Sequence, residues 1–171
     1  SSEGIVMSFS GFTPAGTNTN VDNVWLDGAT SIDSSGSDED WYFPNNNSNS
    51  SSYLITLDMG SSYNKVVNSF RLNLGNNTNC GVWKFQGSND NSNFTDLLSS
   101  FTWQGTIGGT GQYYTDFDFT NTTQYRYFRF QGVSGNVSNS PYQTSLMLKE
   151  ATNNLVVNAT GSFESNAITA L

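Results

Sequence analysis

Oxygen-bearing side chains gather in the stretch WLDGATSID, where Asp27, Thr30, Ser31 and Asp33 fall within seven residues. Calcium is a hard cation that takes about six to eight oxygen ligands from carboxylates, hydroxyls and loop carbonyls. The stretch supplies such oxygens and is therefore a candidate metal site. The same letters also suit an ordinary Asp-Gly turn, and the local sequence leaves both interpretations open.

Two further carboxylates, Asp116 and Asp118 in YTDFDF, would lie on one face of a strand. A glycosidase needs an acid and a base about 5 to 10 Å apart in a cleft. The alternation with Phe117 and Phe119 is also the pattern of a strand with one solvated face, and we favour that interpretation. Because the chain has no histidine, Ser-His-Asp triads, Cys-His pairs and imidazole metal sites are excluded. We therefore expect a protein without catalytic activity.

Sugar binding needs an aromatic face for the apolar side of the ring, together with amides or carboxylates that bond its hydroxyls. Aromatic residues and asparagines of this kind occur together in the segments between the expected strands. Any single aromatic can instead pack under its own loop, and any asparagine can instead form a turn. The candidate carbohydrate-binding residues are Tyr42, Asn76, Asn77, Asn79, Trp103 and Tyr142.

The composition fits one all-β domain. The chain of 171 residues holds 12 Phe, 8 Tyr and 4 Trp, which suit half-buried pleated surfaces. Its formal net charge of −8 repels polyanions, so nucleic acid and anionic membrane surfaces are poor partners. Cys80 is the one cysteine, so no disulfide can form within the chain. No apolar run approaches the length of about 20 residues that crosses a bilayer.

Short strands separated by Asn, Ser, Thr and Gly clusters predict a β-sandwich or jelly roll. Long connections between them would carry function, because the sheets hold such loops rigidly. The expected loops are residues 11–23, 31–52, 76–81 and 99–112. The expected strands are residues 5–9, 53–59, 66–74, 82–87, 113–119, 125–133, 144–150 and 155–158.

Five segments carry a resemblance to a known family. In chain order they are LDGATSID, YLITLDMGSSYNKVVNSFRL, WKFQGSNDNSNFTDL, YYTDFDFTNTTQYRYFRFQGVSG and TSLMLKEA. Together they resemble the discoidin, or coagulation factor 5/8 type C, family, which overlaps the family 32 carbohydrate-binding modules. The resemblance covers about residues 20–152. SNDNSNFTDL resembles the family's Ser-Asn-Asp-Gly-x-Asn-Trp-x-x-Leu hairpin, with Asn91 in place of Gly and Phe94 in place of Trp. These are framework positions, so that segment is expected to be scaffold.

The resemblance implies a galactose-binding-domain-like jelly roll of about eight main strands, generally noncatalytic, whose loops at one end bind glycans or lipid head groups. It also implies a structural Ca²⁺ near the Asp-Gly turn, closed by a glutamate on the last strand, and Asp27 and Glu150 match these positions. Ile32 stands where many members have a ligating Thr, so Thr30, Ser31 or Asp33 must substitute. Lipid-binding members combine protruding apolar side chains with basic residues. These loops lack that combination, so membrane lipid is the less favoured ligand.

Trp41 matches a framework tryptophan of the family, and this makes Tyr42 the better sugar platform. From Ala151 onward the chain loses its aromatic residues. The tail NNLVVNATGSFESNAITA is similar to a segment of structural proteins of marine bacteriophages, which implies a virion protein such as a tail fibre and a trimeric assembly.

We therefore expect a lead-in strand in residues 1–19, the sandwich in residues 20–152, and a linker or the first strand of a further module in residues 153–171. The chain opens with SSEGIVMSF, which looks like an excised or processed piece of something longer. The expected location is extracellular or on a virion surface, and the expected partner is a cell-surface glycan. The alternative is a structural spacer or decoration domain without a small-molecule ligand.

Overall fold

The computed structural model describes residues 5–14, 24–26, 43, 49–63, 65–109, 112–137 and 143–151. Within these ranges nearly all regular structure is β-strand, together with one short 3-10 turn, Ser50–Ser52. The strands are β1 Val6–Ser10, β2 Val24–Leu26, β3 Leu54–Asp58, β4 Val67–Leu74, β5 Val82–Ser88, β6 Thr95–Thr102, β7 Ile107–Gly109, β8 Gln112–Asp118, β9 Tyr127–Ser134 and β10 Gln143–Glu150.

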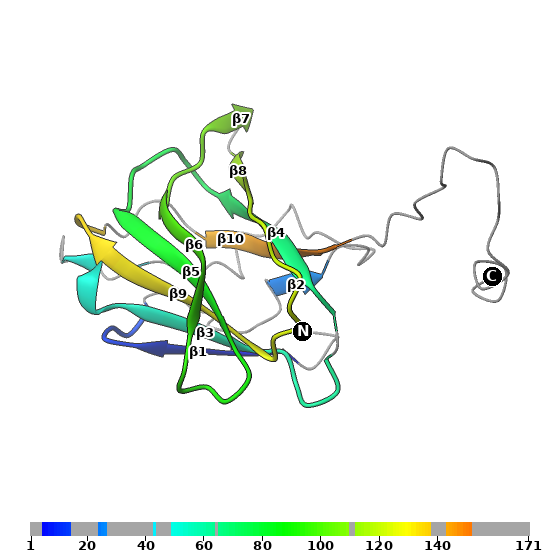
Figure 1. The fold of residues 1–171 in the computed structure, drawn as a ribbon. Coiled ribbons are helices and arrows are strands. Elements are labelled where there is room, and N and C mark those ends of the chain that lie inside the picture. The colour runs from blue at the N-terminus through cyan, green and yellow to red at the C-terminus, as the bar shows by residue number, and fades with distance from the viewer. Residues whose placement is uncertain are drawn as a thin grey trace, which may run out of the picture.

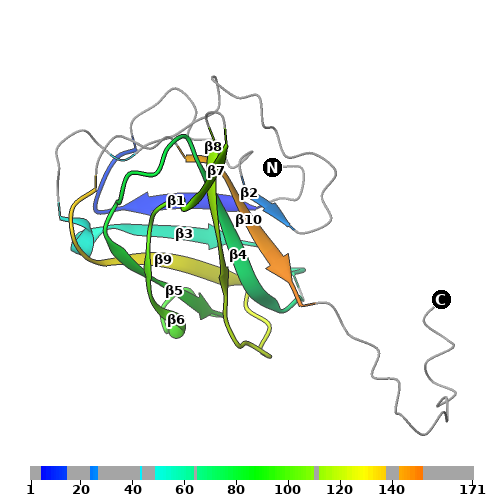
Figure 2. The same cartoon turned by 90° about the horizontal axis from the view of Figure 1, so that it is seen from above.

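Two five-stranded sheets face each other (Figures 1 and 2). The first sheet has the order β1-β3-β9-β5-β6 and the second sheet the order β2-β10-β4-β8-β7. Neighbouring strands are antiparallel, except that β2 runs parallel to β10. This is the β-sandwich that the sequence predicts, and the expected all-β class is confirmed.

The register gives the sandwich two distinct ends. At the first, which we call the loop end, β4 finishes and β5 begins, and β9 finishes close to the start of β10. The β6–β7 connection lies there too, because of the pairing of β6 with β5. The segment before β3 reaches the same end, where Asn49 forms a bridge with Asn136. The opposite end holds the β3–β4, β5–β6 and β8–β9 connections, the start of β1 and the finish of β10.

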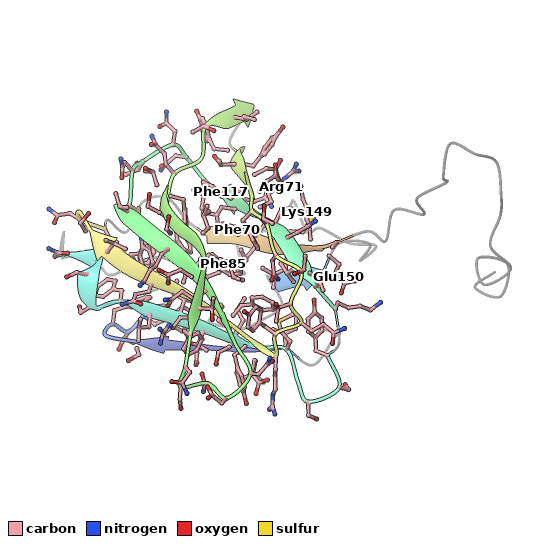
Figure 3. The ribbon with its side chains drawn as sticks, viewed as in Figure 1. Phe70, Arg71, Phe85, Phe117, Lys149 and Glu150 are labelled. Atoms are coloured by element: carbon pink, nitrogen blue, oxygen red, sulfur yellow. The ribbon has the colours of Figure 1, made fainter. Side chains whose placement is uncertain are left out.

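Aromatic rings fill the space between the sheets. The Phe70 ring lies 4.9 Å from Phe85, 4.9 Å from Phe117 and 5.1 Å from Phe130, measured between centroids. Figure 3 shows Phe70, Phe85 and Phe117 pointing into the interior from strands of both sheets. Each such pair contributes about 0.5 to 1.5 kcal/mol beyond its buried area, so this cluster fixes how the two sheets face each other.

Most expected strands are confirmed to within a few residues, and the misses have physical causes. β6 is indicated in the sequence only by the hairpin resemblance of SNDNSNFTDL, because TDLLSSFT does not alternate cleanly and, as an edge strand with register shifts, is buried only in part. β2 and β7 are edge strands of three residues, which is too short to show the alternation of apolar and polar residues that predicts a strand. Residues 99–112, expected as a loop, therefore include the last part of β6 and all of β7. The expected strand at residues 155–158 lies outside the described residues.

The hairpin between β5 and β6 is held by one carboxylate. Asp90 accepts hydrogen bonds from the backbone N–H groups of Ser92 at 2.8 Å and Asn93 at 2.7 Å, and from the Asn93 side chain at 2.7 Å. These donors lower the pKa of Asp90 well below its usual range. Asn91 has a φ of 57°, in the left-handed region. Asparagine tolerates this conformation better than most residues other than glycine, which explains why it can stand where the family has Gly.

The Phe that replaces the family's Trp packs on the outer face of the first sheet. The guanidinium carbon of Arg129 lies 3.7 Å from the centroid of the Phe94 ring, and Arg129 Nε donates to Gln86 Oε1 at 2.9 Å. Gln86 is itself buried. Phe94 therefore covers a polar pair on the sheet, which agrees with the expected scaffold role of this segment.

An ion-pair group joins three strands on the outer face of the second sheet. Asp116 on β8 accepts from Arg71 Nε at 2.8 Å and Nη2 at 2.7 Å, and from Lys149 Nζ at 2.8 Å. Figure 3 shows Arg71 and Lys149 on neighbouring strands. The Arg71 hydrogen bonds are the main reason that the pKa of Asp116 falls to about 2.

We predict that Asn91→Ala lowers the free energy of unfolding by about 1 kcal/mol and that Asn91→Gly leaves it unchanged or slightly raised, since only Gly adopts this φ without strain. Urea unfolding of both variants measures this. Ser92→Ala, in the same exposed turn, is the control and should change stability by less than about 0.5 kcal/mol. Equal losses in the Ala and Gly variants would contradict the strain argument.

We also predict that Asp116 makes the fold acid-sensitive. Its folded pKa of about 2 lies below the ordinary value of 3.8, so its stabilisation is complete above about pH 4 and is lost as the pH falls toward 2. Asp116→Asn should cost about 2 kcal/mol at neutral pH, and the gap to wild type should narrow in acid. Chemical unfolding across this pH range tests it, with the exposed Asp118→Asn as control. A gap that stays constant with pH would contradict it.

Candidate functional site

Two asparagines shape the β4–β5 connection at the loop end. Asn76 Oδ1 accepts from the Thr78 N–H at 2.8 Å, and Asn79 Oδ1 accepts from the Gly81 N–H at 2.8 Å. Each pair is an Asx turn, in which the side chain replaces a backbone turn. Gly81 has a φ of 86°, and a Cβ there would lie 2.7 Å from the Ser134 carbonyl oxygen, so the residue must be glycine.

The β6–β7 connection packs beside this turn. The Trp103 N–H donates to the Gly81 carbonyl at 3.0 Å, and the Cys80 N–H donates to the Trp103 carbonyl at 2.9 Å. One residue later, Gln104 Nε2 donates to the Asn77 carbonyl at 2.7 Å. The two connections therefore form one hydrogen-bonded unit, in which the Gln104 side chain lies against the Asn77 backbone.

Three of the candidate sugar-binding residues thus come together. Asn77 and Asn79 are exposed and Asn76 is half-buried, all within four residues of chain. The amide oxygens of Asn76 and Asn79 are engaged in turns, so both the turn-forming and the surface interpretations of these asparagines hold. Amide groups on a fixed backbone donate and accept hydrogen bonds in set directions, which is what recognition of sugar hydroxyls requires.

Trp103 is not at the surface, and this corrects its assignment as a sugar-binding residue. Its side chain is 2% exposed, and its ring lies 5.0 Å from Trp83 and 5.3 Å from Phe130 between centroids. The residue was expected in a loop, but the alternation of β6 continues past Phe101 and turns Trp103 inward. The two-residue spacing of Phe101 and Trp103 in FTW predicts that both side chains face the same side of the strand.

Three further residues at the loop end were not among the binding candidates predicted from the sequence. Gln104 holds the asparagine turn, and Thr106 Oγ1 lies 2.9 Å from Thr115 Oγ1. The half-buried Tyr113 ring packs on the β7 backbone, since a Cβ at Gly108 would clash with its Cδ1. The glycines in WQGTIGG were the available signal for a close ring contact. Tyr42 and Tyr142, the remaining aromatic candidates, lie outside the described residues.

The candidate metal residues are only partly described. Glu150 ends β10 at the opposite end, and its Oε1 accepts from the Tyr63 hydroxyl at 3.3 Å. Leu26 pairs with Leu148, so β2 finishes at the same end as Glu150. Asp27, Thr30, Ser31 and Asp33 lie outside the described residues. Within the described part, His, Cys, Asp and Glu side chains form no group of three or more that could hold a metal ion.

Asp116 does not fit the protonated acid of a glycosidase, because it is paired with two cations. A glycosidase needs one carboxyl group whose raised pKa keeps it protonated for the leaving group. Arg71 and Lys149 instead hold Asp116 ionised, with a pKa of about 2. The strand pattern with one solvated face is therefore the better description of YTDFDF, as the sequence analysis preferred.

None of the helical segments in the described residues is long and apolar enough to span a membrane.

Solved structures with similar folds include carbohydrate-binding modules. The family 32 module from C. perfringens NanJ, solved in complex with galactose, is 15% identical with a TM-score of 0.53, and the match covers 85% of this chain and 92% of that chain. CBM32-1 from a family 31 glycoside hydrolase of Clostridium perfringens is 12% identical with a TM-score of 0.52, covering 85% and 94%. At these identities the likeness establishes the fold.

A search of curated proteins found no match to the chain. The family model described as the F5/8 type C domain matches residues 14–146. This range takes in most of the chain and every strand except β1 and the second half of β10. The chain belongs to the F5/8 type C, or discoidin, domain family.

Proposed function

We propose that this chain is a noncatalytic carbohydrate-binding module that holds a cell-surface glycan at its loop end. The observation that carries the proposal is the hydrogen-bonded unit of the β4–β5 and β6–β7 connections, which presents Asn77, Asn79 and Gln104 on a rigid two-sheet support. Tyr113 flanks the unit, and Tyr42 and Tyr142 are further aromatic candidates. The galactose complex of the structurally similar NanJ module supports the same class of ligand.

A shallow site of this kind binds weakly by itself, because it buries only part of a sugar. Several copies on one particle raise the effective concentration and convert weak contacts into firm attachment. We therefore place the module in a larger assembly at an extracellular or virion surface. A tail fibre, with a trimer as its oligomeric form, is the specific setting suggested by the resemblance of residues 153–171 to phage proteins.

We further propose a structural Ca²⁺ at the opposite end, with Asp27 and Glu150 as ligands and with oxygens from Thr30, Ser31 or Asp33. Two described features support it: the carboxylate of Glu150 lies at the finish of β10, and β2 delivers the chain to the same end. Calcium would link the segment after β2 to β10. Since the proposed sugar site is at the other end, the ion's role is stability.

For the glycan site, we predict that Asn77→Ala weakens binding of a cognate sugar about tenfold, the loss expected for one or two hydrogen bonds. The Asn77 side chain is exposed and is not part of the Asx turns, so folding should be unaffected. NMR titration with simple sugars measures this, with Ser99→Ala on β6 as control. Shift changes away from the loop end would contradict the location, and no response to any glycan on a broad array would favour the spacer alternative.

For the metal, we predict that chelation lowers the melting temperature and that Asp27→Ala and Glu150→Gln each abolish this sensitivity. A ligand of micromolar affinity at millimolar Ca²⁺ stabilises a fold by about 4 kcal/mol. Glutamine retains an acceptor for the Tyr63 hydroxyl, so the Glu150→Gln result reports on the ion rather than on that hydrogen bond. Equal melting of wild type with and without chelator would refute the site. Asp118→Asn, which should keep its sensitivity, is the control.

A further inference from the structure

Every basic residue of the chain can be placed, because all six Lys and Arg lie in described segments and the chain has no histidine. Two of them, Arg71 and Lys149, bind Asp116 on the outer face of the second sheet. Arg126 holds Asp58 through two hydrogen bonds of 2.8 and 2.9 Å at the opposite end. All three are therefore engaged with carboxylates away from the loop end.

The other three basic residues also lie away from it. Arg129 is packed against Phe94 and bonded to Gln86 on the outer face of the first sheet. Lys84 lies on the same face, 3.4 Å from Asp96. Lys65 borders a cavity of about 340 Å³ at the opposite end, together with Glu150. The loop end thus receives no positive side chain from any part of the chain.

The described residues of the loop end carry no charge of either sign. They are residues 10–14, 49–53, 75–81, 103–109, 112–113, 134–137 and 143, and all of them are apolar, hydroxyl, amide or glycine residues. Their polar side chains, such as Asn77 and Gln104, offer amides that pair with hydroxyl and acetamido groups. Uncharged partners of this kind lose little by leaving water when each hydrogen bond is replaced.

An anionic sugar needs a positively charged partner, which these uncharged groups do not supply. A carboxylate or sulfate is costly to desolvate without a paired cation, and strong recognition of such groups uses Arg or Lys in charge-assisted hydrogen bonds. The formal net charge of −8 adds a long-range repulsion that slows the approach of anions. Both the local and the global electrostatics therefore disfavour acidic glycans.

We propose that the glycan taken by this module is uncharged, a neutral hexose or N-acetylhexosamine, and that uronic, sialylated and sulfated sugars are not ligands. This inference rests on the proposed function and narrows it to one chemical class. It predicts that binding varies little with salt, since no ion pair forms between protein and ligand.

The test is a set of matched pairs that differ only in one acidic group: galactose with galacturonate, glucose with glucuronate, and a β-galactoside with its sialylated form. Binding to the wild-type chain is followed by NMR at low and at physiological salt. We expect at least one neutral member to bind about tenfold more tightly than its acidic partner, at both salt concentrations.

The outcomes separate the two claims. Equal or tighter binding of an acidic member, with or without added Ca²⁺, overturns the inference and leaves sugar binding intact. Absence of binding by every member, extended to a glycan array, overturns the proposed function and the inference with it.

A gain-of-binding variant tests the reason for the selectivity. Asn77→Lys places a cation at the loop end and should improve binding of the acidic member about tenfold relative to the neutral one. Ser99→Lys adds the same charge to an exposed position of β6 and should leave the preference unchanged. Equal gains in both variants would show that overall charge alone sets the preference, which contradicts the role assigned to the loop end.

Discussion

The packing of aromatic rings between the two sheets is the constraint on which the rest of this domain depends. Phe70 on β4 contacts Phe85 and Phe130 of the first sheet and Phe117 of its own sheet, with centroids about 5 Å apart. A chain without a disulfide must obtain its rigidity from such contacts. The cluster continues through Trp83 and Trp103 toward the loop end, so that the backbone beneath the polar surface residues is anchored in the core.

Rigid loops follow from this core and from side chains that serve as turns. Asn76 and Asn79 fix the β4–β5 connection, and Trp103 ties it to the β6–β7 connection through backbone hydrogen bonds. Backbone groups that would otherwise need water are thereby satisfied within the protein. The exposed amides consequently stand in defined directions without ordering a flexible segment on binding, which lowers the entropic cost of recognition.

Much of this architecture could be predicted from the sequence, and the elements that were missed have physical causes. The expected strands at residues 66–74 and 125–133 correspond to β4 and β9, because their alternation of buried and half-buried residues leaves a clear two-residue period. β6 and Trp103 were misjudged, because an edge strand with register shifts has no clean period and a tryptophan near a loop looks like a surface residue. The pairing of Asp116 with Arg71 and Lys149 joins residues far apart in the chain, so no local pattern encodes it. The meeting of Gln104 with the Asn77 carbonyl is hidden for the same reason.

The central claim is that a stiff sandwich presents uncharged amides at one end to hold a neutral sugar. A crystal structure with the tightest-binding neutral saccharide tests it most directly. The account predicts a sugar bound at the loop end, with hydrogen bonds to amide side chains of the β4–β5 and β6–β7 connections and no Lys or Arg in contact. A sugar bound beside Arg71 and Lys149 on the second sheet, or in the cavity next to Lys65, would contradict it.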